Sequence, residues 1–176
     1  MPGTKPAVFS IMSYKTNILT GLACLFASAA AFADIQVGQA FPDLSTFSLE
    51  GKLPARTGQV VLVDFWATWC APCKSSFPAY SDLQREFSDR GVVVVAVSVD
   101  KTRGPYEEFV QRFAPSFTTV RDGQQKLVAA AQVPAMPTAY LIDRKGVLRA
   151  VHSGFHGADS VRALREEINR LLEEKL

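Results

Sequence analysis

The chain has 176 residues, 48% of them hydrophobic and 20% charged, which is the composition of a globular protein with one sizeable core. Its formal net charge of +2 is accounted for by Lys5 and Lys15, because the first 33 residues contain no acidic side chain. The remaining segment is formally neutral. This balance argues against nucleic acid and against an acidic surface as partners.

Residues 1–33 have the pattern of a secretory signal peptide. Lys15 precedes an apolar stretch, residues 18–30, that is short for a membrane span, and Ala31-Phe32-Ala33 has the A-x-A form of a cleavage site. We therefore expect cleavage after Ala33 and a single periplasmic domain of residues 34–176. An uncleaved N-terminal membrane anchor is the alternative.

Cys24 lies inside this predicted signal peptide, so the mature chain would keep only Cys70 and Cys73. A lipoprotein site at Cys24 is poorly supported by the preceding Gly21-Leu22-Ala23. Export would place the two remaining cysteines in a compartment that permits disulfides.

The next elements predict an α/β fold with a central mixed sheet flanked by helices. The segment from Asp34 to Pro54 mixes glycine, proline and serine with scattered apolar residues, and we expect a small hairpin there, packed on the edge of the domain. Strands are expected at 60–65, 92–99, 118–120, 138–142 and 147–151, and helices at 74–88, 102–113, from 122–123 to about 132, and 160–174.

The most informative stretch is Val60 to Pro78, where a buried strand runs into Cys70-Ala71-Pro72-Cys73 and then into a helix. Unpaired N–H groups and the dipole at a helix start stabilise a thiolate on the first cysteine. Pro72 suits the first helical turn because it has no N–H to leave unpaired. The pattern indicates a redox dithiol.

Two cysteines at this spacing can also serve purposes other than redox chemistry. A structural zinc site needs further ligands, but Cys24, His152 and His156 lie far along the chain. Cu(I) bound by the two thiolates is a second possibility, and a static structural disulfide is a third. The loop that such a disulfide would close is too short to be a useful crosslink.

The stretch D-F-W-A-T-W-C-A-P-C-K resembles the thioredoxin superfamily. With F-P-D-L near the start and V-P-A-M-P-T-A-Y-L-I-D-R-K-G later, it is similar to the TlpA/ResA-like branch of extracytoplasmic thiol–disulfide oxidoreductases. The resemblance covers about Gly38 to Leu172. It implies a thioredoxin fold and a place in reactions such as cytochrome c maturation.

The resemblance also suggests roles for individual residues. Cys70, the more exposed cysteine in this motif, would attack the substrate disulfide, and Cys73 would resolve the mixed disulfide. Asp64 would lie behind Cys73 and take its proton. An aspartate in an apolar strand needs a partner or a bound proton, although an edge-strand aspartate facing water is the alternative.

The expected substrate surface combines residues from two loops. Pro137 resembles the cis-proline that faces the dithiol in this superfamily, which would expose the backbone of Met136 to a client chain. Trp69, Ala71 and Pro72 complete the predicted surface. An ordinary trans proline at this position is the alternative.

One position departs from the family pattern. Ser76 stands where the TlpA/ResA-like pattern has an acidic residue, as in C-x-x-E-x-P, so dependence on Asp64 and a role in cytochrome c maturation need separate support. Lys74 is expected to be either a thiolate-stabilising charge or a solvated helix lysine. His152 and His156 are expected to be loop residues rather than a metal pair.

Together these features predict an exported, monomeric reductant of protein disulfides. It needs no organic cofactor and no metal, because the Cys70/Cys73 dithiol carries two electrons, but it does need a thiol-reducing donor in the membrane. The alternatives are a Cu(I) chaperone using the same sulfurs and a peroxiredoxin-like peroxidase. The peroxidase frame P-x-x-x-T-x-x-C requires a threonine where this chain has Ala67.

Overall fold

The computed structural model describes Met1, Gly3 and residues 35–175. Except for Met1 and Gly3, the predicted signal peptide and its cleavage site lie outside these residues. The strands are β1 (Val60–Trp66), β2 (Val92–Ser98), β3 (Thr118–Arg121), β4 (Thr138–Ile142) and β5 (Leu148–Ser153). The helices are α1 (Ala71–Phe87), α2 (Arg103–Phe113), α3 (Lys126–Ala130) and α4 (Ala158–Glu173).

The five strands form one mixed sheet in the order β3-β2-β1-β4-β5. The central strand β1 runs parallel to β2 and antiparallel to β4. All seven residues of β1 are buried, which explains its continuous apolar run, because both faces of the sheet are covered. This arrangement confirms the predicted α/β class and mixed sheet.

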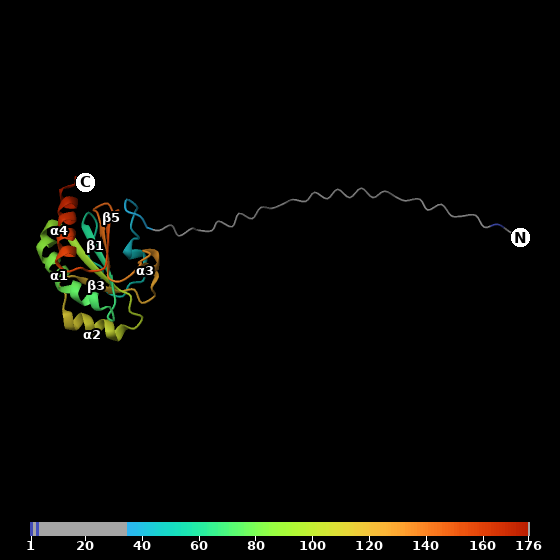
Figure 1. Cartoon of the computed structure of the whole chain (residues 1–176), viewed down its shortest axis with the longest axis horizontal. Helices are drawn as coiled ribbons and strands as arrows, with labels where there is room; N and C mark the ends of the chain where they lie inside the picture. The colour runs from blue at the N-terminus through green and yellow to red at the C-terminus, as the bar shows by residue number, and fades with distance from the viewer. Residues whose placement is uncertain (2, 4–34, 176) are drawn as a thin grey trace. The chain divides into compact units, whose positions relative to one another are not determined.

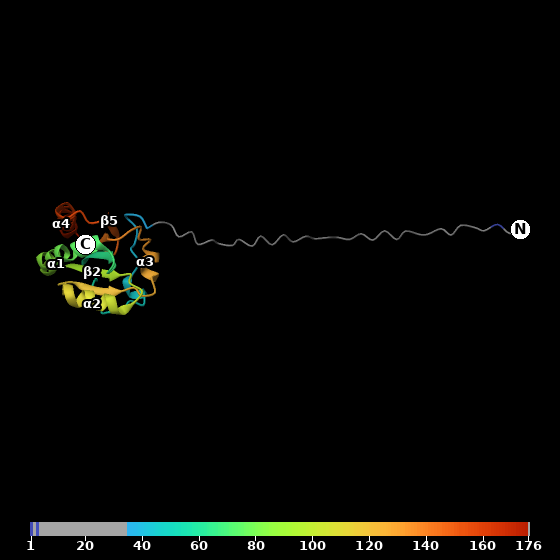
Figure 2. The same cartoon turned by 60° about the horizontal axis from the view of Figure 1, so that its bottom comes forward.

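The helices cover the two faces unequally. In Figures 1 and 2, α1 and α4 lie on one side of the sheet and α3 lies on the other. The side chain of Trp66 contacts Phe77 of α1 and Phe109 of α2, so α2 shares the face with α1. On the opposite face Phe65 packs edge-on against Tyr140, which also contacts Phe41 from the N-terminal segment. Each face therefore has its own aromatic cluster.

The N-terminal segment differs from the expected hairpin. Within residues 35–54 the structure has a short 3₁₀ helix, Leu44–Thr46, and two isolated bridges, one between Ala40 and Val147 and one between Glu50 and Arg121. Val147 precedes the edge strand β5 and Arg121 ends the opposite edge strand β3. The segment pairs with both edges of the sheet and so cannot pair with itself.

Two helix boundaries also differ from the expectation. Helix α1 begins at Ala71 rather than at residue 74, because Cys70 already acts as its N-cap. Helix α3 is shorter than expected, since its N-cap residue Gln125 has a left-handed backbone (φ 55°) that separates Asp122 from the helix. Among the described residues, no helix is long and apolar enough to cross a membrane.

Candidate active site

The dithiol lies where β1 leaves the sheet and α1 begins. The backbone N–H of Cys70 donates to the carbonyl of Ala67 at 3.0 Å, closing a turn between the strand and the helix. Cys70 is the N-cap of α1, and its Sγ accepts from the backbone N–H of Cys73 at 3.3 Å. The two cysteines form a disulfide with their Cα atoms 5.3 Å apart. A sulfur held in this way at a helix N-terminus is stabilised as a thiolate once the disulfide opens.

The two sulfurs differ in their access to solvent. Cys70 retains 5% of its surface and Cys73 none, so Cys70 is the more exposed of the two, and the attacking and resolving roles stay predictions. Around Cys70 the surface is formed by Trp69, which is 70% exposed, and by the exposed residues Ala71 and Pro72. Of the two cysteines only Cys70 keeps exposed surface, and it directly follows the exposed Trp69 in the chain.

Trp66, three residues before Trp69, is fully buried and belongs to the core. Its ring lies 4.5 Å from that of Phe109 and 4.7 Å from that of Phe77, measured between centroids. Of the two tryptophans that precede the dithiol, one therefore belongs to the core and the other to the surface.

The second predicted loop lies at the same end of the sheet. The bond between Met136 and Pro137 is cis, as expected from the motif. Thr138, the next residue, pairs with Phe65 near the carboxyl end of β1, which places the loop at the sheet end that carries the dithiol. Pro137 is buried and Met136 partly exposed. The roles proposed for both residues in binding a client chain stay predictions.

Asp64 is fully buried in the middle of β1, between Ala96 of β2 and Ala139 of β4. This position excludes the edge-strand alternative. Neither carboxylate oxygen has a hydrogen-bond partner among the described residues. Burial without a partner raises the pKa of Asp64 well above its ordinary value, since the charged form loses its hydration.

The charge of Asp64 affects the pKa of Tyr80, a buried residue of α1. Burial raises the pKa of its phenol, and the nearby Asp64 charge raises it further. Asp64 lies two residues before Trp66, whose side chain contacts Phe77 of α1, so by strand alternation Asp64 points to the face of the sheet that α1 covers. A carboxyl group in this environment takes up a proton more readily than an exposed aspartate does.

Ser76, at the position where the family pattern has an acid, is fully buried. Its hydroxyl donates to the backbone carbonyl of Cys73 at 2.9 Å and so is satisfied within the helix. The position supplies no charge to the dithiol. Lys74 is exposed on the helix surface.

The two histidines take part in separate local contacts. His152 Nε2 lies 2.7 Å from Glu167 Oε2, and the backbone N–H of His156 donates to Ser160 at 2.9 Å. Within the described part of the chain no group of three or more His, Cys, Asp or Glu side chains could hold a metal ion.

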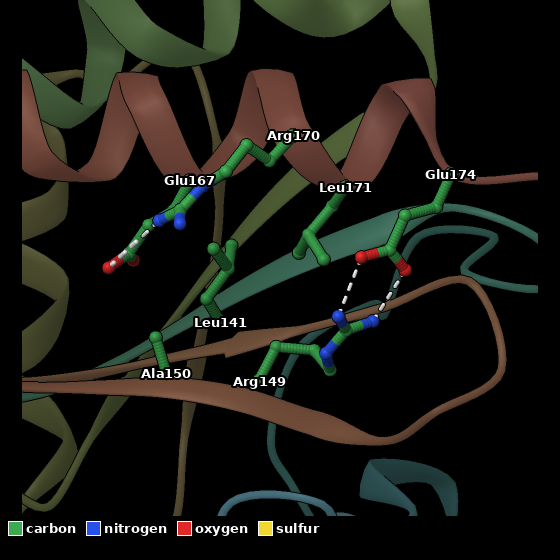
Figure 3. Close-up of a pocket in the computed structure, with 7 residues that line it drawn as sticks. All are labelled: Leu141, Arg149, Ala150, Glu167, Arg170, Leu171 and Glu174. Carbon is green, nitrogen blue, oxygen red and sulfur yellow. Dashed lines mark hydrogen bonds and ion pairs between the residues drawn. The ribbon is translucent and has the colours of Figure 1, made fainter.

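A cavity of about 150 Å³ lies between β4, β5 and α4 (Figure 3). Arg149 and Glu174 form a double ion pair across one side of it, and Glu167 faces Arg170 on the other. Its charged groups are thus paired with one another, and none of its lining residues belongs to the dithiol turn.

One residue close to the site was missed by the sequence reasoning. Asp100 follows β2, is 5% exposed, and accepts hydrogen bonds from Thr68 in the turn before Cys70. An acidic residue two positions after a strand composed mostly of valine was the available signal, because functional groups gather at the carboxyl ends of parallel strands.

Comparison with known proteins identifies the family to which this chain belongs. The model of the AhpC/TSA family matches residues 37–151. The chain belongs to this family. Thiol-disulfide oxidoreductase ResA from Geobacillus thermodenitrificans is 31% identical over 137 residues, which cover 76% of this chain and 79% of the relative. The thioredoxin-like protein YneN from Bacillus subtilis is 37% identical over 126 residues, or 68% of this chain and 73% of the relative.

A solved structure gives the same answer for the fold. The crystal structure of a Chlorobium tepidum protein assigned as the thiol:disulfide interchange protein DsbE is 35% identical and superimposes with a TM-score of 0.72, over 78% of this chain and 99% of that one. The expected thioredoxin fold is confirmed. With the Cys70–Cys73 pair in place, the chain is a thiol–disulfide oxidoreductase.

Proposed function

We propose that this protein is exported to the periplasm and reduces disulfide bonds in other proteins. The observation that carries the proposal is the asymmetric dithiol, with Cys70 at the surface as the N-cap of α1 and Cys73 fully buried one turn later. An accessible sulfur can attack a client, and a shielded sulfur reacts only with its neighbour.

The reaction consists of two exchanges. The Cys70 thiolate attacks one sulfur of the client disulfide, forms a mixed disulfide and releases the other client sulfur as a thiolate. The Cys73 thiolate then attacks Cys70, which releases the second client thiolate and leaves the oxidised Cys70–Cys73 pair. The two electrons of the dithiol end on the client sulfurs. The Cys73 proton leaves through its base, and solvent returns this proton and the one that Cys70 lost on ionising, which converts both client thiolates to thiols.

Asp64 is the proposed acceptor of the Cys73 proton in the second exchange. A carboxylate whose pKa is raised by burial is a stronger base than an ordinary aspartate, because its charged form has lost the hydration that stabilises it. It has no competing hydrogen-bond partner among the described residues. The absence of an acid at Ser76 leaves Asp64 as the buried carboxylate facing α1.

Trp69, Ala71, Pro72 and the Met136-Pro137 turn are the proposed client-binding surface. Client proteins lie against the exposed indole and pair with the backbone of Met136, so recognition involves main chain more than particular side chains. Substrates in cytochrome c maturation are one candidate class. The protein acts as a monomer, uses no metal or organic cofactor, and is reduced again by a thiol donor in the membrane.

Turnover of insulin disulfides with dithiothreitol as the electron source tests the proposed activity. The purified domain should accelerate insulin precipitation, while the Cys70→Ala variant should not. Tight retention of Cu(I) without insulin turnover would instead favour the copper chaperone, and peroxide consumption without insulin turnover would favour a peroxidase.

Export is tested separately, by N-terminal sequencing of the protein recovered from the periplasm. The A-x-A pattern predicts that the sequence begins at Asp34. An N-terminus at Cys24, or an intact membrane-bound chain, would contradict the proposed processing.

A further inference from the structure

A second buried carboxylate lies beside the turn that carries Cys70. Asp100 follows β2, and both of its oxygens act as hydrogen-bond acceptors. Thr68 Oγ1 donates to Oδ1 at 2.8 Å, and the Thr68 backbone N–H donates to Oδ2 at 3.0 Å. Ser98 Oγ donates to Oδ2 at 2.7 Å. Asp100 thus holds Thr68 through both its side chain and its backbone.

Thr68 occupies the centre of the turn that leads from β1 to the nucleophile. The turn is closed by the bond from the Cys70 N–H to the Ala67 carbonyl, and Thr68 is its second residue. On the strand side, the Val99 N–H donates to the carbonyl of Trp66 at 2.9 Å. The contacts with Asp100 fix the turn from the side of β2.

We propose that Asp100 is a positioning residue for Cys70, holding the Ala67–Cys70 turn so that the nucleophilic sulfur stays at the N-terminus of α1. The inference rests on the proposed thiol–disulfide exchange at Cys70. In the oxidised protein the disulfide itself ties Cys70 to the helix. After reduction this covalent tie is gone, and the turn is held by its own hydrogen bonds and by Asp100.

The backbone of Asp100 is itself anchored by a buried arginine. Arg121 Nη1 donates to the carbonyls of Asp100 and Lys101, at 3.0 and 2.9 Å. Arg121 Nη2 pairs with Glu50 of the N-terminal segment, and Glu50 also binds Arg103 of α2. Through Glu50 and Arg121, the N-terminal segment therefore helps to hold the backbone of Asp100 in place.

The test compares single-turnover kinetics in three variants of the reduced protein. Thr68→Val removes the hydrogen bond from the Thr68 side chain and keeps those from its backbone N–H, whereas Asp100→Ala removes them all. We expect Cys70 to attack a small disulfide about threefold more slowly in the first and about tenfold or more in the second, the scale of losing charge-assisted hydrogen bonds. The double variant should be no slower than Asp100→Ala, because both changes break the same contact.

Thr102→Val is the matched control. Thr102 is exposed at the start of α2 and makes no side-chain capping bond, so the same change of atoms should leave the attack rate unaltered. Thr68→Ser, which keeps the hydroxyl, should restore most of the rate lost in Thr68→Val.

The pH midpoint of Cys70 alkylation by iodoacetamide separates positioning from simple stability. A sulfur that drifts from the helix N-terminus loses thiolate stabilisation, so the midpoint should rise in Thr68→Val and Asp100→Ala. Unchanged midpoints and attack rates in folded variants, with only a lower thermal midpoint, would overturn the proposal. If Asp100→Ala does not fold, Thr68→Val decides alone. Alkylation needs no client, so the result holds even if wild-type protein fails to reduce insulin.

Discussion

Asp64 of β1 and Asp100, which follows the neighbouring strand β2, are both buried carboxylates, and they have opposite environments. Asp64 lies between two alanines and has no hydrogen-bond partner among the described residues. Asp100 accepts bonds from Thr68 and Ser98 at both of its oxygens. Residue type and burial alone therefore do not assign a role to an acidic side chain.

The difference follows from what each environment does to the charged form. Hydrogen bonds replace lost hydration, so Asp100 can stay buried as a fixed acceptor that organises the turn. Asp64 receives no such compensation, and its raised pKa makes it a site for proton exchange. In the roles that we propose, Asp100 holds the turn in place and Asp64 takes part in proton transfer at the same dithiol.

The largest effect on activity is expected from removing either cysteine, because the two sulfurs carry out the exchange itself. Cys70→Ala should abolish insulin turnover. Cys73→Ala should also stop turnover but should accumulate a mixed disulfide with clients, because the resolving thiol is absent. Non-reducing electrophoresis of periplasmic extracts measures the trapped species. Equal trapping by the two variants would remove the distinction between attacking and resolving cysteine.

The next largest effect concerns Asp64. Asp64→Asn should slow turnover by about 10²- to 10⁴-fold near neutral pH, the typical contribution of a general base. Insulin turnover measured between pH 6 and 8 tests this. A variant with wild-type kinetics over that range would return Asp64 to a purely structural role.

The raised pKa of Asp64 should also make the stability of the protein depend on pH. Its pKa is raised in the folded state, so the native protein binds a proton that the unfolded chain releases once the pH exceeds the ordinary value. Wild-type protein should lose stability relative to Asp64→Asn as the pH rises from about 4. The loss should be up to about 1.4 kcal/mol per pH unit between the ordinary pKa of an aspartate and the raised pKa of Asp64 in the folded protein. Urea unfolding of the oxidised proteins at several pH values measures the difference. Parallel stability curves would contradict the raised pKa.

A smaller effect, a loss of stability, is expected when Asp100 is changed to asparagine. Asp100→Asn keeps one acceptor oxygen but turns an N–H donor toward a site that contains donors from Thr68 and Ser98. We expect a loss of about 1–3 kcal/mol in unfolding free energy at pH 7, the cost of breaking a buried hydrogen bond to a charged group. Urea unfolding of the oxidised protein checks it. An Asn variant as stable as wild type would mean that Asp100 and Asp64 are less different than their contacts indicate.

The local features of the site were predictable from the sequence. The apolar run of β1, the helix start at Cys70 and the lone aspartate within the strand are visible in one stretch of the chain. Asp100 was not predictable in the same way, because its role depends on the register that pairs Trp66 with Ser98 and so brings the end of β2 beside the turn.

The N-terminal segment was mispredicted for a related reason. Its glycines, prolines and polar residues are typical of a local hairpin, but its backbone partners are Val147 and Arg121, both far along the chain. Each of these bridges involves a single residue of the segment, which is too short to leave an alternating pattern in the sequence. Local chemistry was therefore readable from the sequence, whereas contacts between elements required the structure.

The redox potential of the Cys70/Cys73 pair tests the central claim, reduction of client disulfides, most directly. Ala71 and Pro72 separate the cysteines, and neither is cationic, so the strong thiolate stabilisation that produces an oxidant is not expected. Equilibration of the purified domain with a series of glutathione or dithiothreitol buffers gives the midpoint. We predict a value below about −200 mV, towards the roughly −270 mV of thioredoxin, and a midpoint near −120 mV would show that the protein inserts disulfides instead.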